Sequence, residues 1–323
     1  MSAALSLCVI VRDEEELLVR ALASAQRGYD ELVVVDTGSR DGSRHVARRF
    51  GARVIEFTNA NGADGTLLDF AAARNVALTA ASGDYWWWMD ADEVAVPGTV
   101  NRLRELAHEG PANAVRGVTR DGGTRWLRTR LAPRDGRHVW AGAVHEWVQA
   151  PNGWVDDAQV AFDHRPRPDR GRAPLIRNLR ILGRELVAGR AGAREHFYIA
   201  RTLEAMGQRE SAVRAYQYLL AMPALFEADI AFARLYLARL LLGLGETRAA
   251  VVQAVLVLGA HPRFAEAACL IGDVAADLGD LLLAARWYGR AIASGPCPLG
   301  PLFHEPACYD EYPRRRLAAL RNT

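Results

Sequence analysis

Apolar residues in the first part of the chain fall into short runs that alternate with helical stretches. Strands are expected at residues 5–11, 31–35, 53–57 and 85–89, and helices at residues 13–27, 43–49 and 68–80. Continuous apolar strands separated by helices are typical of a parallel sheet that helices cover on both faces. Ligands of such sheets bind at the carboxyl ends of the strands. The residues directly after each strand are therefore the first candidates for a functional site.

Residues 94–165 follow a less regular pattern, in which tryptophans are interleaved with Arg and Gly. These tryptophans are Trp126, Trp140, Trp147 and Trp154. We expect further strands and loops here, which complete a first domain over residues 1–165. Residues 165–171 have the Pro-rich composition of a linker, and a linker with a connecting helix is expected over residues 166–192. The consecutive Trp86, Trp87 and Trp88 are expected in the core of the sheet.

The last part of the chain repeats a pattern of small residues. Each unit has a small residue, then a glycine seven positions later, then an alanine five positions after that. The three units are Ala200, Gly207 and Ala212; Ala238, Gly245 and Ala250; and Gly272, Gly279 and Ala284. The units are 38 and then 34 residues apart, close to the roughly 34 residues of the tetratricopeptide (TPR) repeat. We therefore expect TPR-like helical repeats over residues 193–323, with an ordinary helical bundle as the alternative.

Composition and charge limit the classes of protein to which the chain could belong. The formal charge of the 323 residues is only +2, so the overall charge does not indicate a protein that binds nucleic acid. All 40 basic residues are arginines, so a phosphate would be held by Arg or by backbone amides. The four cysteines lack the spacing of a metal site, and we identify neither a signal peptide nor a transmembrane segment. These features favour a cytoplasmic protein.

Carboxylates follow two of the expected strands. Asp36 comes directly after the second strand, where it could accept hydrogen bonds from a base or ribose, and the glycines after it let the chain turn closely around a ligand. Asp90 and Asp92 follow the fourth strand, and both would face one crevice if the chain stayed extended. Such oxygen ligands suit Mg²⁺ or Mn²⁺ held largely through a diphosphate. The metal would neutralise charge that develops on a diphosphate leaving group.

Four segments in this order resemble the family 2 glycosyltransferases, which have the GT-A fold. They are Arg12-Asp13-Glu14-Glu15, Asp36 to Ser43, Leu68 to Asn75, and Gly83 to Glu93. The resemblance is close over residues 5–95 and looser up to residue 165. It implies an α/β fold: a GT-A domain with a Rossmann-like mixed sheet, followed by an all-α domain of TPR-like repeats, as in a bacterial subgroup of the family.

The resemblance also implies roles for individual residues. Asp36 matches the aspartate that contacts the nucleotide base, and Asp69 and Arg74 match positions near the nucleotide. Asp90 matches the carboxylate on the ribose or metal side, and Asp92 the direct ligand of Mn²⁺ or Mg²⁺.

The segment after the first strand departs from the family pattern. The family often has Asn-Glu at this point, where this chain has Arg12-Asp13-Glu14. Glu14 is therefore matched to the family's glutamate near the nucleotide, and Asp13 is left without a matched role.

Inverting members of the family need a carboxylate base that deprotonates the acceptor. A Val-His-Glu segment similar to the one that ends at Glu146 closes the active site in this subgroup, so Glu146 is the candidate base. His145 could bind the metal or the diphosphate. His164 is a rival metal ligand, because GT-A enzymes often supply one late in the domain, and Asp121 is a weaker candidate base. In the other interpretation, these side chains only pack or form turns.

The resemblance implies a nucleoside-diphosphate sugar as donor, with UDP as the family default, and a peptide side chain or a glycan or lipid-linked sugar as acceptor. TPR arrays commonly hold peptides or protein surfaces in a groove, so the repeats could present a peptide acceptor, form a homodimer or dock onto an assembly. One alternative is a catalytically inactive TPR scaffold that binds a nucleotide or a partner protein. A nucleotidyltransferase would instead need a basic, Gly-rich loop after the first strand, where this chain is acidic.

Overall fold

The computed structural model describes residues 3–122, 124–168, 171–223, 225–297 and 305–320. The chain divides into two compact units, Met1–Ile181 and Leu182–Thr323. The division falls within helix α5 (Ala173–Val187), inside the range predicted as linker and connecting helix. Asp169 and Arg170 of the predicted linker lie outside the described residues.

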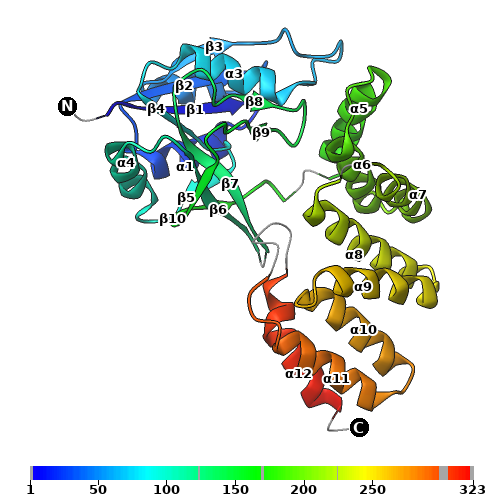
Figure 1. The fold of residues 1–323 in the computed structure, drawn as a ribbon. Coiled ribbons are helices and arrows are strands. Elements are labelled where there is room, and N and C mark those ends of the chain that lie inside the picture. Colours follow the sequence, from blue (N-terminus) through cyan, green and yellow to red (C-terminus); the bar gives the residue numbers. More distant parts are fainter. Residues whose placement is uncertain (1–2, 123, 169–170, 224, 298–304, 321–323) are drawn as a thin grey trace. The chain divides into compact units, whose positions relative to one another are not determined.

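The first unit is built on a sheet of eight strands in the order β3-β2-β1-β4-β7-β6-β10-β5 (Figure 1). The strands are β1 (Leu5–Val11), β2 (Glu31–Asp36), β3 (Arg53–Glu56), β4 (Tyr85–Trp88), β5 (Glu93–Ala95), β6 (Ala114–Asp121), β7 (Thr124–Pro133) and β10 (Trp154–His164). β1, β2, β3 and β4 are parallel, whereas β7 runs antiparallel to β4 and β6. The sheet is therefore mixed, as predicted. Two short strands, β8 (Trp140–Ala141) and β9 (Trp147–Val148), pair with each other.

Helices cover both faces of this sheet because its central strands are apolar on both sides. The helices are α1 (Glu15–Ala25), α2 (Ser43–Arg49), α3 (Phe70–Ala80) and α4 (Thr99–Glu109). Buried residues of α1, α2 and α4 share one core with Leu7 and Trp87. Buried residues of α3 form a second core with Cys8, Trp86 and Trp88. The alternation of side chains along β4 thus sends its tryptophans to opposite faces.

The predicted elements of this unit are present, with ends that differ by a few residues. The strand predicted at residues 5–11 and the helix predicted at 43–49 have those bounds. The helices predicted at 13–27 and 68–80 begin two residues later than expected. Trp86, Trp87 and Trp88 are fully buried, which confirms them as core residues.

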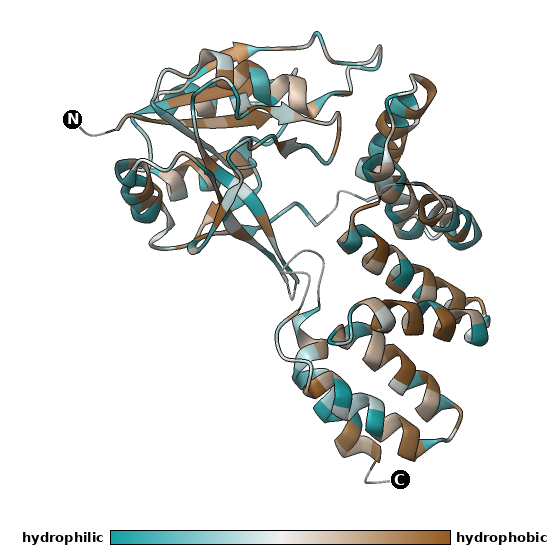
Figure 2. Ribbon diagram, viewed as in Figure 1, coloured by the Kyte–Doolittle hydropathy of each residue, from teal (hydrophilic) through white to brown (hydrophobic). Residues whose placement is uncertain are grey.

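The second unit consists of helices α6 (Ala193–Ala205), α7 (Arg209–Leu220), α8 (Glu227–Gly243), α9 (Thr247–Ala260), α10 (Ala265–Asp277), α11 (Leu281–Ile292) and α12 (Glu311–Leu320), with a 3₁₀ turn, η1 (Pro306–Tyr309). The strongest contacts join α6 to α7, α8 to α9, and α10 to α11. These are the three helix pairs that the repeat predicts. Figure 2 shows the apolar residues that prevail on α9, in contrast to the mainly polar helix α4 of the first unit.

The small residues of the repeat occupy the positions that close packing requires. Gly207, Gly245 and Gly279 have φ angles of 77°, 82° and 81°, and each lies in the turn between the two helices of a pair. This left-handed conformation favours glycine. The alanines of the repeat are fully buried, and a Cβ atom on Gly272 would lie 2.7 Å from the ring of Tyr288. The repeated spacing of small residues in the sequence therefore reflects the turns and close contacts between paired helices.

Within the described part of the chain, every helix is too short or too polar to cross a membrane.

Candidate active site

The loops that follow β1 and β2 hold each other through reciprocal hydrogen bonds. The carboxylate of Asp13 accepts from the backbone N–H of Arg40 at 2.6 Å, and the N–H of Asp13 donates to Ser39 Oγ at 3.1 Å. The N–H of Glu14 donates to Ser43 Oγ at 2.9 Å. Both loops lie at the carboxyl edge of parallel strands, where ligands of such sheets bind.

Asp36 and Glu14 differ in what their side chains contact. The Asp36 side chain is fully buried and accepts hydrogen bonds from the backbone N–H groups of Gly38 and Ser39, at 3.1 Å each. It therefore shapes its own loop, as a buried carboxylate in a turn often does. The Glu14 carboxylate lies 3.4 Å from the guanidinium of Arg167, just after β10.

Asp69 begins the helix that carries Arg74. Its side chain caps α3 by accepting from the N–H of Ala72 at 2.8 Å. Such a cap stabilises a helix by about 1 kcal/mol. The cap sets the start of α3, so Arg74 projects from the first turns of the helix toward the end of β4.

Arg74 joins two of the predicted site residues. Its guanidinium donates to Asp90 Oδ1 at 2.6 Å and to Glu146 Oε1 at 2.7 Å. The same group lies 4.2 Å from the ring centroid of Trp88 and 4.8 Å from that of Trp140. Aromatic faces attract a guanidinium, and Arg74 is only 4 % exposed. Residues 74, 90 and 146, which are distant in sequence, thus form one cluster.

Sequence reasoning missed three further members of this cluster. Arg128 donates to Asp90 Oδ2 at 2.8 Å, and Arg130 makes a double ion pair with Glu93 at 2.5 and 2.7 Å. Glu93 Oε2 also accepts from the N–H of Asp90 at 2.8 Å. The Glu93 carboxylate therefore holds the loop after β4 in place. The available signal was the i, i+2 spacing of Arg128 and Arg130, which puts both on one face of a strand.

The arginines keep the clustered carboxylates ionised. Burial alone would raise the pKa of Asp90 and of Glu146, but the positive charges of Arg74 and Arg128 outweigh it and hold both pKa values below the usual range. Burial also opposes the charge on Arg74, yet Asp90 and Glu146 raise its pKa. Three arginines face three carboxylates, so the cluster has no formal net charge.

Asp92 belongs to a different set of contacts from Asp90. The chain turns after β4, where the N–H of Glu93 bonds to the carbonyl of Asp90 at 3.1 Å, so it does not stay extended between the two aspartates. Asp92 Oδ2 lies 3.1 Å from His164 Nε2, and Asp121 Oδ2 lies 3.2 Å from His164 Nδ1. These hydrogen bonds, with that to Asp92 first, raise the pKa of His164 to about 9 against the opposing effect of burial.

Asp92 and His164 are two candidate ligands of a divalent metal ion. Among the described residues no group of three or more His, Cys, Asp and Glu is arranged to hold a metal ion. A carboxylate and an imidazole are nonetheless ligands that Mn²⁺ accepts, and Asp121 bonded to the other ring nitrogen matches the outer-shell carboxylate that orients a metal-binding histidine. His145, the other candidate, has a φ of 53° in the loop between β8 and β9.

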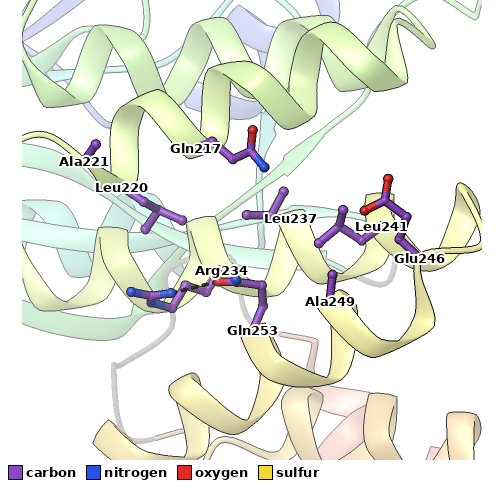
Figure 3. Close-up of a pocket in the computed structure, with 9 residues that line it drawn as sticks. All are labelled: Gln217, Leu220, Ala221, Arg234, Leu237, Leu241, Glu246, Ala249 and Gln253. Carbon is purple, nitrogen blue, oxygen red and sulfur yellow. Dashed lines mark hydrogen bonds between the residues drawn. The ribbon is translucent and has the colours of Figure 1, made fainter.

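A cavity of about 300 Å³ lies elsewhere, in the helical unit between α7, α8 and α9. Figure 3 shows the side chains that line it, among them Arg234, Gln217 and Gln253. None of the candidate site residues is among those lining residues. This cavity is therefore separate from the carboxylate cluster.

Comparison with known proteins bears on the sheet unit. Residues 6–146 match the model of glycosyl transferase family 2. These residues form a family 2 glycosyltransferase domain. The matched range ends at Glu146 and includes every residue of the carboxylate cluster. It also includes Asp36 and Asp92, whereas His164 lies beyond it.

Two curated relatives match parts of the chain. A TPR repeat-containing protein of Synechococcus elongatus is 47% identical over 112 residues, which cover 35% of this chain and 26% of the relative. An uncharacterized glycosyltransferase of Mycoplasma pneumoniae is 28% identical over 108 residues, which cover 31% of this chain and 35% of the relative. The chain thus matches about a quarter to a third of the length of these relatives.

Two solved structures show a low overall similarity to the chain. The S. aureus TarS 1-349 structure in complex with UDP has a TM-score of 0.45 and 14% identity, over 79% of this chain and 92% of that chain. The mannosyltransferase PcManGT from Pyrobaculum calidifontis, in complex with GDP-Man and Mn²⁺, has a TM-score of 0.42 and 18% identity, over 80% of this chain and 88% of that chain.

Proposed function

We propose that the chain is a metal-dependent glycosyltransferase that moves a sugar from a nucleoside-diphosphate sugar, with UDP-sugar favoured, to an acceptor nucleophile with inversion at the anomeric carbon. The observation that carries this proposal is the contact of Arg74 with both Asp90 and Glu146. One guanidinium thereby links the loop after β4, where a donor diphosphate would lie, to the carboxylate proposed as base. The family 2 match over residues 6–146 supports the same activity.

The balanced charge of the carboxylate cluster favours a metal ion as the partner of a bound diphosphate. Each of its three arginines is already paired with a carboxylate, so a bound diphosphate needs another cation. Asp92 and His164 would hold Mn²⁺ or Mg²⁺, with Asp90 on its ribose or metal side and His145 as the rival ligand. The ion would neutralise charge on the diphosphate leaving group. Asp121 would act as a positioning residue through its bond to His164.

Glu146 is proposed as the base that takes the proton from the acceptor. Its pKa lies below the usual value because Arg74 and Arg128 overcome the effect of burial, so the carboxylate is ionised at neutral pH and able to accept a proton. Asp36, Glu14, Asp69 and Arg74 are proposed on the nucleotide side. For Asp36 and Asp69 this role is exerted through the loop and the helix start that they shape.

The acceptor is proposed to be a peptide side chain or a glycan or lipid-linked sugar, which the helical repeats would help to present. The first unit would form the catalytic domain over residues 1–165, and the repeats would span residues 193–323. Three helix pairs of the second unit support the repeat assignment.

The proposal is tested by thermal shift with UDP, GDP, CDP and TDP, each with and without Mn²⁺, on wild type and on Asp92→Ala. A ligand stabilises the folded chain according to its occupancy. We expect one nucleoside diphosphate to raise the melting temperature only with Mn²⁺, and Asp92→Ala to abolish that rise. Asp157→Ala, which removes a carboxylate bonded to Arg102 instead, is the matched control and should keep it.

If the folded wild type responds to none of the nucleotides, the transferase proposal fails and a non-catalytic scaffold becomes the better explanation. If Asp92→Ala keeps the metal-dependent response, the assignment of Asp92 as metal ligand fails while nucleotide binding stands.

A further inference from the structure

The segment Glu305–Arg316 lies against the first helices of the second and third repeats. We refer to it as the C-terminal segment; it comprises η1 and the first part of α12. The carboxylate of Glu305 makes a double ion pair with Arg239 on α8, at 2.6 and 3.0 Å. The backbone N–H of Glu305 donates to Glu266 on α10 at 2.9 Å. One residue of the segment thus contacts two successive repeats.

Two tyrosines of the C-terminal segment continue this contact along α10. Tyr309 donates its hydroxyl to Glu266 Oε2 at 2.7 Å, and Tyr312 donates to Asp273 Oδ2 at 2.7 Å. Together with Arg239, the carboxylates of Glu266 and Asp273 form a row of three charged side chains that we call the acceptor row. The C-terminal segment presents one carboxylate, Glu305, and then two phenol hydroxyls, four and seven residues later.

The repeat pattern shows that Arg239 of the acceptor row lacks the carboxylate that its counterpart in the first repeat finds on its own helix. Arg239 follows Ala238 as Arg201 follows Ala200 in the first repeat. Arg201 is paired at 2.7 Å with Glu204, three residues further along its own helix. The residue three after Arg239 is Leu242, and the carboxylate on Arg239 comes from Glu305 instead. The C-terminal segment therefore supplies the carboxylate partner that the second repeat lacks at this position.

The C-terminal segment is held by contacts that another ligand can replace. Among its described residues only Cys308 and Pro313 are buried. The pair of Arg239 with Glu305 has side chains that are 34% and 48% exposed, and ion pairs this exposed contribute only about 0–1 kcal/mol. Polar residues also prevail on α12 (Figure 2). Tyr309 and Tyr312 are partly buried against the core of the repeats, and a ligand with tyrosines at the same positions would make the same contacts.

We propose that the acceptor row is a binding surface for polypeptide segments that carry a carboxylate followed by tyrosines. The C-terminal segment is its intramolecular occupant, and a partner segment of the same chemistry displaces it. The charge complementarity of Glu305 with Arg239, and of the tyrosine hydroxyls with two carboxylates, specifies this ligand. The inference concerns protein binding by the helical unit and does not depend on sugar transfer.

The experiment uses a fluorescently labelled peptide of residues 305–316 and the full chain. A segment joined to its binding surface competes at high effective concentration. In a triple variant, Glu305→Gln with Tyr309→Phe and Tyr312→Phe, this competition is weakened while the acceptor row is intact. We expect the peptide to bind the triple variant at least about 10-fold more tightly than wild type, as measured by fluorescence anisotropy.

Two arginines of α8 provide the matched pair of variants. Adding Arg239→Gln to the triple variant should weaken peptide binding by about 10-fold or more, the loss expected when a double Arg–carboxylate contact is removed. Adding Arg234→Gln should leave binding unchanged, because Arg234 bonds to Gln253 beside the cavity of Figure 3. A folded triple variant that does not bind the peptide, or binding that ignores Arg239→Gln, overturns the proposal.

Hydrogen exchange of the wild-type chain tests the same idea without substitutions. A displaceable segment opens locally, so amides of α12 should exchange faster than those in the middle of α10. Exchange of both helices in one common opening would mean that the segment is an integral part of the repeat fold, and would overturn the proposal.

Discussion

The two units bury polar groups in different ways. In the family 2 domain, ion pairs are buried: Arg130 and Glu93 are both fully buried, and the guanidinium of Arg74 lies next to the rings of Trp88 and Trp140. In the helical unit, the repeated tyrosine positions place buried rings with their hydroxyls on partly exposed acids, as Tyr216 does with Glu204 at 2.9 Å. The first arrangement concentrates charge at one place, whereas the second repeats a modest contact along an array.

This difference indicates that the buried ion pairs of the family 2 domain serve function, whereas the tyrosine contacts of the helical unit serve packing. A buried ion pair is often no more stabilising than apolar residues of similar volume, although breaking it is costly. The presence of buried ion pairs at the carboxyl ends of the strands therefore indicates a functional site. A tyrosine that buries its ring and keeps its hydroxyl near the surface needs no such explanation, because the apolar area stabilises the repeat. Breaking each arrangement should reveal the contrast.

Arg74→Met should have the largest effect on stability. It leaves the carboxylates of Asp90 and Glu146 with less compensation in a buried cluster, which costs about 3–5 kcal/mol. Urea unfolding of the full chain measures the loss. Adding Glu146→Gln should recover part of it, because one uncompensated charge is removed. A loss below about 1 kcal/mol would mean that the cluster is solvated and that the contrast between the units is wrong.

Gly272→Ala should have the next largest effect. Its Cβ atom would lie 2.7 Å from the Tyr288 ring, and overpacking of this kind should outweigh the gain in helix propensity and leave a net loss of about 1–2 kcal/mol. Gly289→Ala, where no atom lies within 4 Å of the added Cβ, is the control and should stabilise α11 by about 0.5–1 kcal/mol. Equal melting temperatures for the two variants would refute the close contact.

Tyr216→Phe should cost about 1 kcal/mol, because it removes one hydrogen bond to Glu204 and leaves the ring in place. Tyr218→Phe on the same helix removes an exposed hydroxyl and should change nothing measurable. Far-UV circular dichroism during urea unfolding gives both values. If Tyr216→Phe cost as much as Arg74→Met, the two kinds of polar contact would be equivalent, contrary to the comparison above.

Glu266→Gln should have the smallest effect, visible mainly as a change with pH. Burial raises the pKa of Glu266 above its usual value of 4.5, against hydrogen bonds from Tyr309 and the backbone. The folded chain therefore holds this proton more tightly than the unfolded chain. The stability that it contributes is present below pH 4.5 and is lost as pH rises through the raised pKa. Melting temperatures from pH 4 to 8 should fall more for wild type than for Glu266→Gln; parallel curves would contradict the prediction.

The fold was largely accessible from patterns that act over short distances. Apolar runs and their spacing predicted β1, β2 and the helices between them, because burial of a strand or helix face depends on the nearest neighbours in sequence. The repeat was equally accessible, since Gly207, Gly245 and Gly279 each serve a turn between adjacent helices. The predicted bounds differed from the observed ones by two residues at the starts of α1 and α3 and at the end of α1, and by one residue at the ends of β2, β3 and β4.

The sequence predicted individual residues of the candidate site but not the contacts between them. Asp36, Asp90, Asp92 and Glu146 were identified from motifs and from the resemblance to a family, but not their partners. Nothing local connects Arg128 to Asp90, which are 38 residues apart, or His164 to Asp92, which are 72 residues apart. Strand order brings these residues together, and it depends on the pairing of β7 with β4 and of β10 with β5.

The sequence by itself determined the elements, the repeat and the carboxylates available for chemistry, because secondary-structure period and turn geometry are properties of neighbouring residues. The tertiary structure alone decided which carboxylate each arginine neutralises, how Asp90 and Asp92 separate into two sets of contacts, and that Glu305 completes the second repeat. These contacts depend on the burial of charge, and a buried charge is stabilised only by the particular partner that the fold places beside it.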